Sequence, residues 1–85
     1  MKSRKRRMLL SWMIEKGTFT SHQVIQWGSK FFYNSANRTK RHFVEDGYLH
    51  SLTDHEKIAS GYSTKEGVYR ITQKAIDENL FINFA

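Results

Sequence analysis

Ser35 to Gly47 reads Ser-Ala-Asn-Arg-Thr-Lys-Arg-His-Phe-Val-Glu-Asp-Gly, and this stretch decides the fold that the sequence predicts. We expect a helix over residues 35–46, because Ser35 is a typical N-cap and Gly47 a typical residue just past a helix C-terminus. Three residues recur at helical spacing and are expected to face a core: Ala36, Thr39 and Phe43. The opposite face then carries basic groups and an amide: Asn37, Arg38, Lys40 and Arg41.

Two helices are predicted before this stretch. The first covers residues 3–16, with Gly17 after its end. Its apolar residues fall at steps of three and four and are expected to pack in the core: Met8, Leu9, Trp12 and Met13. An extended link follows, in which Phe19 points inward and Thr20 or Ser21 caps the next helix. That helix is expected over residues 21–27, closed by Gly28 and buried through Val24, Ile25 and Trp27.

Three aromatic residues precede the central helix. We expect Phe31 and Phe32 to fill the junction between helices, and Tyr33 to offer its hydroxyl to a phosphate. The alternative is that one of these rings stacks on a base.

Two strands are predicted after the central helix. Residues 48–52 and 67–72 alternate in strand fashion and should pair antiparallel, joined by a polar, flexible loop over residues 53–66. Thr72 then caps a last helix from Gln73 to about Asn79, with Ala75, Ile76 and Leu80 expected on its inner face.

Composition limits the classes of function. The 85 residues predict a single domain, 1–85, too small for a large enclosed catalytic pocket, so we expect no enzyme. The chain has no cysteine and no apolar run long enough to span a bilayer, so we expect a cytoplasmic protein without a membrane anchor. The four histidines form no metal-binding pattern, and no phosphate-binding glycine motif occurs, so no metal, cofactor or small-molecule effector is predicted.

The charge is divided unevenly along the chain. Residues 1–42 contain ten Lys or Arg and one acid, a balance of +9, whereas residues 43–85 contain four Lys or Arg and seven acids, a balance of −3; together they give the net +6. Such a distribution presents a positive face to a polyanion, and nucleic acid is the commonest one inside cells. A solvated basic tail is the alternative interpretation.

The N-terminal residues 1–7 concentrate the positive charge. They are interpreted as a basic arm, or as the exposed first turns of a helix, with four cations expected at phosphates: Arg4, Lys5, Arg6 and Arg7.

The order of these elements resembles the winged helix-turn-helix superfamily of bacterial, archaeal and viral regulators. The resemblance covers nearly the whole chain and is carried by three segments: residues 19–21, residues 43–49 (Phe-Val-Glu-Asp-Gly-Tyr-Leu) and residues 68–75 (Val-Tyr-Arg-Ile-Thr-Gln-Lys-Ala). Phe43 stands where many members have leucine, and Ala75 where glycine is usual. The resemblance implies an α+β fold with a three-helix core, a two-stranded wing and a C-terminal helix.

The resemblance also implies that the helix over residues 35–46 enters the major groove of DNA while the loop over residues 53–66 contacts the backbone or minor groove. A guanidinium can bind guanine in bidentate fashion and a carboxamide can bind adenine, so three residues are the base-reading candidates: Asn37, Arg38 and Arg41. Further candidates are assigned to the DNA backbone: Lys30, Tyr33, Ser35, Lys40, His42, Lys57 and Lys65. Lys40 lies where the family has a core aliphatic, so its stem is expected to be buried and its ammonium exposed.

The predicted function is therefore sequence-specific binding of double-stranded DNA, as a small transcription regulator. The alternative is a winged-helix protein-interaction module, an inhibitor or adaptor that does not act through DNA. The apolar end of the chain packs back on the first helix or joins two copies into a homodimer through Leu80, Phe81, Ile82 and Phe84.

Overall fold

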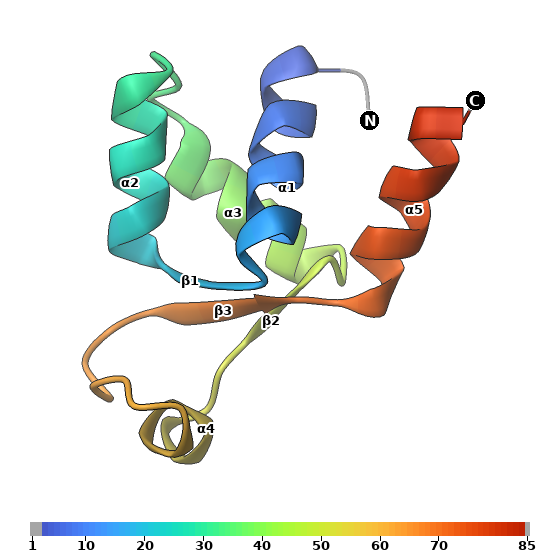
Figure 1. The fold of residues 1–85 in the computed structure, drawn as a ribbon. Coiled ribbons are helices and arrows are strands. Elements are labelled where there is room, and N and C mark those ends of the chain that lie inside the picture. The colour runs from blue at the N-terminus through green and yellow to red at the C-terminus, as the bar shows by residue number, and fades with distance from the viewer. Residues whose placement is uncertain (1–2, 85) are drawn as a thin grey trace.

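Five helices and a three-stranded antiparallel sheet form an α+β fold over the residues that the structure describes. The computed structural model describes the backbone of residues 3–84 and the side chains of residues 3–79. The elements follow in the order α1 (Arg4–Lys16), β1 (Thr18–Thr20), α2 (Ser21–Lys30), α3 (Ala36–Glu45), β2 (Leu49–Ser51), α4 (Asp54–Ala59), β3 (Val68–Ile71) and α5 (Gln73–Phe84). In Figure 1, α1 and α2 stand side by side above the sheet with α3 behind them, and α5 stands on the other side of α1.

Local capping signals set the bounds of α1 and α2. The Ser3 hydroxyl accepts a hydrogen bond from the Arg6 amide, and Gly17, with φ 76°, ends α1 by donating to the Met13 carbonyl. Thr20 and Gln23 form a capping box at the start of α2, in which each side chain accepts from the other residue's backbone amide. These caps were predicted at Gly17 and Thr20, and residues 4–7 form the first turns of α1.

Helix α2 continues beyond its predicted end at Trp27, to Lys30. Gly28 is a buried helical residue rather than a terminator, and a Cβ placed on it would lie 2.6 Å from the Tyr33 carbonyl oxygen and 2.9 Å from the Ala36 Cβ. The missing side chain lets the start of α3 pack directly on α2. The Tyr33 amide closes the turn by donating to the Gly28 carbonyl at 2.7 Å.

The sheet has the order β1-β3-β2, so β3 is the central strand. Phe19 lies opposite Tyr69, and Leu49 opposite Ile71. The antiparallel pairing of β2 and β3 was predicted. The third strand was not: residues 18–20 were predicted only as an extended link, since three residues are too few to identify a strand without its pairing with β3.

The hydrophobic core lies between the three first helices and the sheet. Its largest fully buried side chains are Phe19, Phe43, Leu9, Leu10, Met13, Val24 and Val68. The inner face of α3 is as predicted, since Ala36, Thr39 and Phe43 are all buried. Ala75 is likewise buried and brings α5 onto this core.

The start of α5 is bound to the turn between α3 and β2. The Thr72 hydroxyl donates to the Gly47 carbonyl at 2.7 Å, and the Lys74 ammonium donates to the Asp46 carbonyl at 2.6 Å. The Tyr48 hydroxyl donates to Glu78, and this hydrogen bond is the main reason that the pKa of Tyr48 is raised. The residues proposed for a homodimer, Leu80, Phe81, Ile82 and Phe84, lie outside the described side chains.

Several apolar residues predicted in the core lie at the surface instead. Met8 and Ile25 are exposed, and so are Phe31 and Phe32, the latter with 84% of its surface accessible and a positive φ of 56°. The prediction that Phe31 and Phe32 fill the junction is therefore wrong. The junction is instead filled by Tyr33 and Ala36, which are buried and lie close to Gly28.

The connection over residues 53–66 is not a flexible loop throughout, because it contains α4. Thr53 and Glu56 form a second capping box, which starts this helix. Among residues 3–84, no helix has the length and apolarity that a membrane crossing requires.

Replacement of Gly28 by alanine tests the contact between α2 and α3. Alanine in a helix normally gains about 0.5 to 1 kcal/mol over glycine, but forcing a methyl into a packed contact costs about 1 to 3 kcal/mol. Since the clash is with backbone, we expect Gly28→Ala to lower the free energy of unfolding by about 1 to 2 kcal/mol, measured by urea denaturation.

The matched control is Ser29→Ala, at an exposed position on the same helix. It should change stability by less than about 0.5 kcal/mol. A Gly28→Ala variant as stable as the wild type would contradict the close approach.

Candidate nucleic-acid interface

The outer face of α3 carries two exposed guanidinium groups, those of Arg38 and Arg41. They border a hollow of about 400 Å³ at the N-terminal half of the helix, lined by Asn34, Ser35, Asn37, Arg38 and Arg41. Two amides, a hydroxyl and two cations therefore converge on one surface. All of these groups except Asn34 were predicted from the sequence.

Asn34 is the contributor that sequence reasoning missed. It precedes α3 but lies in the same hollow as Arg38 and Arg41. The signal was present, because residues 34, 38 and 41 are spaced by four and three, so the outer stripe of the helix extends back into the turn.

Asn37 is only partly exposed. Its Oδ1 atom is buried and has no hydrogen-bond partner among the described residues. Leaving a buried acceptor unpaired costs free energy. A rotation of the side chain that brings the carboxamide to the surface would remove this cost and is needed before Asn37 can contact a base. Arg38 and Arg41 need no such change.

Ser35 lies at the N-cap position of α3, but its side chain makes no capping hydrogen bond. Its exposed hydroxyl is therefore free of that role and remains a candidate phosphate contact at the N-terminus of the helix.

Lys40 lies on the inner side of α3, with 4% of its surface exposed. Its ammonium donates to the Ser21 hydroxyl at 2.8 Å and to the Tyr69 hydroxyl at 3.0 Å, and lies 4.2 Å from the centre of the Tyr69 ring. The buried stem was expected, but the ammonium is enclosed as well, so the assignment of Lys40 to the DNA backbone is wrong. The residue joins α3 to α2 and β3.

The ammonium of Lys40 also affects its neighbour. Burial of Tyr69 opposes ionisation, but the hydrogen bonds with Lys40 and Ser21 and the charge of Lys40 outweigh it and lower the pKa of Tyr69. The arrangement is that of a buried cation satisfied by hydroxyls and an aromatic ring.

Tyr33 is buried too, and its hydroxyl is 2.7 Å from the Thr39 hydroxyl. Its assignment as a phosphate contact is therefore wrong, because the polar end of the ring points into the protein. The hydrogen bond between the two hydroxyls satisfies the polar group of Thr39 on the buried face of α3.

The basic residues at the start of α1 have different surroundings. The Arg6 guanidinium is 3.5 Å from Nδ1 of His42, and the Lys5 ammonium donates to the Phe32 carbonyl at 2.9 Å. Arg6 and Lys5 thus bind the chain's own surface near α3. Three other candidates, Arg4, Arg7 and Lys30, line hollows on the side of α1 and α2 and not the hollow of α3.

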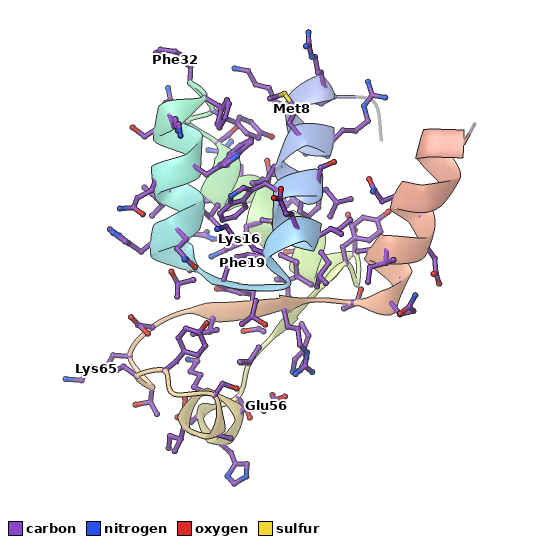
Figure 2. All side chains as sticks on the ribbon, viewed as in Figure 1. Met8, Lys16, Phe19, Phe32, Glu56 and Lys65 are labelled. Atoms are coloured by element: carbon purple, nitrogen blue, oxygen red, sulfur yellow. The ribbon has the colours of Figure 1, made fainter. Side chains whose placement is uncertain are left out.

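The two lysines of the β2–β3 connection also differ. Lys57 is mostly covered and its ammonium donates to the Thr64 carbonyl at 3.3 Å, within the connection itself. Lys65 is exposed and extends away from the protein (Figure 2). Lys65 is the one of the two that is open to a ligand.

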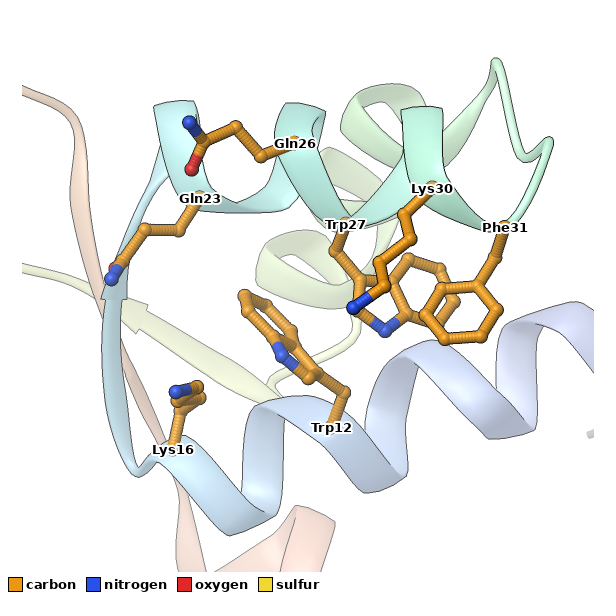
Figure 3. A pocket seen from close by; sticks show the side chains of 7 residues that line it. All are labelled: Trp12, Lys16, Gln23, Gln26, Trp27, Lys30 and Phe31. Carbon is orange, nitrogen blue, oxygen red and sulfur yellow. The ribbon is translucent and has the colours of Figure 1, made fainter.

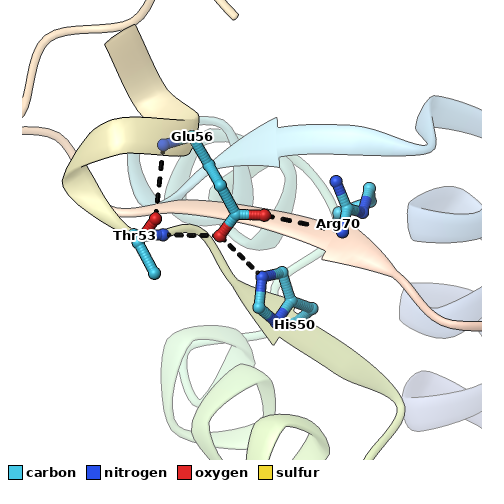
Figure 4. Close-up of polar contacts among 4 residues, drawn as sticks. All are labelled: His50, Thr53, Glu56 and Arg70. Carbon is cyan, nitrogen blue, oxygen red and sulfur yellow. Dashed lines mark hydrogen bonds and ion pairs between the residues drawn. The ribbon is translucent and has the colours of Figure 1, made fainter. Parts of the chain in front are cut away.

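Glu56 fixes α4 to the sheet (Figure 4). Its Oε1 atom accepts from the Thr53 amide at 2.9 Å and lies 2.9 Å from Nε2 of His50, while Oε2 is 3.7 Å from the Arg70 guanidinium. The Thr53 amide, followed by His50, holds the pKa of Glu56 at about 2. The position of α4 on the sheet thus depends partly on one ionised carboxylate.

No group of three or more His, Cys, Asp or Glu side chains among the described residues is arranged to hold a metal ion. Comparison of the chain with models of protein families, with curated proteins and with solved structures finds no match.

The low pKa of Glu56 predicts acid sensitivity. Because this pKa falls from 4.5 to about 2 on folding, its contribution to stability is complete above pH 4.5 and is lost as the pH falls towards 2. Glu56→Gln keeps a hydrogen-bond acceptor but removes the charge. We expect the variant to be less stable than the wild type near neutral pH and the difference to vanish towards pH 2, measured by urea denaturation across this range.

The control is Glu66→Gln, at an exposed position in the same connection. Its free energy of unfolding should differ only slightly from that of the wild type, and this difference should not vanish towards pH 2. A Glu56→Gln difference that is independent of pH would show that the ionised carboxylate does not stabilise α4.

Proposed function

We propose that the chain is a winged helix-turn-helix protein that binds double-stranded DNA sequence-specifically, as a small transcription regulator, with α3 in the major groove. The observation that carries the proposal is the exposed pair Arg38 and Arg41 on the outer face of α3, beside a hollow that also presents amide groups.

The arrangement of elements supports the proposed fold. Helices α2 and α3 are consecutive and pack closely at Gly28, as the two helices of a helix-turn-helix do. Strands β2 and β3 follow α3 and form a ribbon whose connection, residues 52–67, projects from the body as a wing would (Figure 1). Here the connection contains a capped helix in place of a simple loop.

The chemistry of the α3 surface supports base reading. Arginine can donate two parallel hydrogen bonds to O6 and N7 of guanine, and asparagine can pair with N6 and N7 of adenine. Arg38 and Arg41 are one turn apart on the same face, so both can reach successive base pairs. Glu45, exposed one turn after Arg41, disfavours phosphate and suits the amino group of cytosine.

Phosphate contacts are assigned to groups around this helix. The Ser35 hydroxyl and the free amides at the start of α3 suit an anion at one end, and the exposed Lys65 suits one beside the connection. Lys40 takes no part, since its ammonium is held inside by Ser21 and Tyr69.

Arg41→Ala tests the assignment directly. On a preferred duplex we expect the binding free energy to weaken by about 1 to 3 kcal/mol, and on a mixed-sequence duplex by less, because the lost contact is to a base. Lys65→Ala should weaken both duplexes alike and reduce the slope of log affinity against log salt by about 1. Fluorescence anisotropy titrations at several salt concentrations measure these effects.

The matched control is Lys30→Ala, which removes the same charge from the side of α1 and α2. Its affinity for either duplex should stay within about twofold of the wild type, because Lys30 does not line the α3 hollow. If Lys30→Ala and Arg41→Ala weakened binding equally, net charge and not the α3 surface would explain the affinity.

A further inference from the structure

A second surface lies between α1 and α2, away from the α3 hollow, and it is aromatic. Trp12 rises from α1 while Trp27 and Phe31 come from α2 and its end (Figure 3). The ring centres of Trp12 and Trp27 are 6.1 Å apart, and those of Trp27 and Phe31 are 4.9 Å apart. Two hollows of about 400 and 550 Å³ share these three residues, so the rings form the floor of one groove along both helices.

The rim of this groove is basic. Four cations line it against one carboxylate, that of Glu15: they are Arg4, Arg7, Lys16 and Lys30. None of the four is in an ion pair or a side-chain hydrogen bond with another described residue. Near them, Gln23 and Gln26 add neutral groups that can donate and accept hydrogen bonds.

Two apolar side chains of the groove are exposed to solvent and do not contribute fully to the hydrophobic core. Phe31 is 41% exposed and Met8, which lines the same groove, is also exposed. An apolar floor framed by unpaired polar groups is a form that protein-binding sites take. The α3 surface does not account for it, since no residue of α3 lines either hollow.

The position of the rings argues against single-stranded nucleic acid as the occupant. Stacking a base requires an open ring face. Trp27 is only 8% exposed and Trp12 is partly buried, so these indoles close the bottom of the groove and do not present faces. Apolar side chains that insert from above fit such a floor better than flat bases do.

We propose that the groove between α1 and α2 binds an acidic amphipathic helix of a partner protein. Large apolar side chains on one face of that helix would insert over Trp12, Trp27 and Phe31, as in other helix-in-groove complexes. Its carboxylates, on the flanks, would pair with Arg4 and Arg7 at one end and with Lys16 and Lys30 along the rest. Since α2 has 10 residues and α1 has 13, the groove suits a partner helix of about 12 residues, some 18 Å long.

This proposal does not rest on DNA binding by α3. A regulator that held DNA through α3 would leave this groove open to a second protein. A module that bound no DNA would still have it. The two surfaces can therefore be tested separately with different variants.

The probe is a synthetic helical peptide without tryptophan, built from glutamate and alanine with leucine and phenylalanine at positions i, i+3, i+4 and i+7. The chain has two tryptophans, and both line the groove, so their fluorescence reports directly on its occupation. We expect a saturable change in tryptophan emission with this peptide. The binding should be at least about tenfold weaker for a version with lysine in place of glutamate, because attraction to the rim becomes repulsion.

The variants locate the site. Phe31→Ala removes an apolar contact within the groove, and Phe32→Ala, at the neighbouring and more exposed ring outside it, is the matched control. Phe31→Ala should weaken the acidic peptide several-fold and Phe32→Ala should not. Combined Arg7→Glu and Lys16→Glu should weaken it about tenfold. Phe31→Ala, which changes no charge, should leave the affinity for duplex DNA within about twofold of the wild type.

Three results would overturn the proposal. They are the absence of a tryptophan response to the acidic peptide, a response of the same size in both phenylalanine variants, and tighter binding of a single-stranded oligothymidylate to the groove. A concentration-dependent dimer that Phe31→Ala dissociates, detected by sedimentation, would assign the groove to a second copy of the chain instead.

Discussion

The close approach of α2 and α3 at Gly28 is the constraint on which the remaining arrangement depends. With no side chain there, the Tyr33 carbonyl and Ala36 lie against the helix backbone, and α3 leaves the turn at a fixed angle. That angle directs Ala36, Thr39 and Phe43 inward and leaves Arg38 and Arg41 outside. In the middle of α3, Lys40 supports the same orientation by binding Ser21 and Tyr69. The packing at Gly28 and the hydrogen bonds of Lys40 thus together keep the face with Arg38 and Arg41 exposed to solvent.

Local signals in the sequence predicted most helices and strands. The features that they did not predict depend on packing between residues distant in the sequence. The hydroxyl of Thr20 and the glycine at position 17 set helix ends through neighbouring backbone atoms, so they can be read directly. Gly28 carries the same local signal as a terminator, but its contact with Ala36 exists only after α3 has packed. The strand of residues 18–20 likewise depends on pairing with β3. The helix α4 was not predicted, although Thr53 and Glu56 have the spacing of a capping box.

In the candidate site too, local spacing predicted some side chains correctly and non-local contacts decided the others. Arg38 and Arg41 were predicted to lie outside because they stand opposite apolar residues in the helical repeat, and both do. Tyr33 and Lys40 were misjudged because polar atoms can be satisfied inside a protein by partners distant in the sequence, here Thr39 and Tyr69. The positive charge of the first 42 residues is also not one patch. It is divided between the α3 surface and the groove of α1 and α2, which fits the two partners proposed, DNA and an acidic helix.

The central claim is that α3 reads the sequence of DNA. Selection from a library of random duplexes at moderate salt tests it most directly, because nonspecific attraction to phosphates is weakened there while base contacts are retained. We expect enrichment of a short motif containing guanine, the base that arginine prefers in the major groove. Recovery of duplexes without any enriched motif, or of no duplex at all, would contradict it.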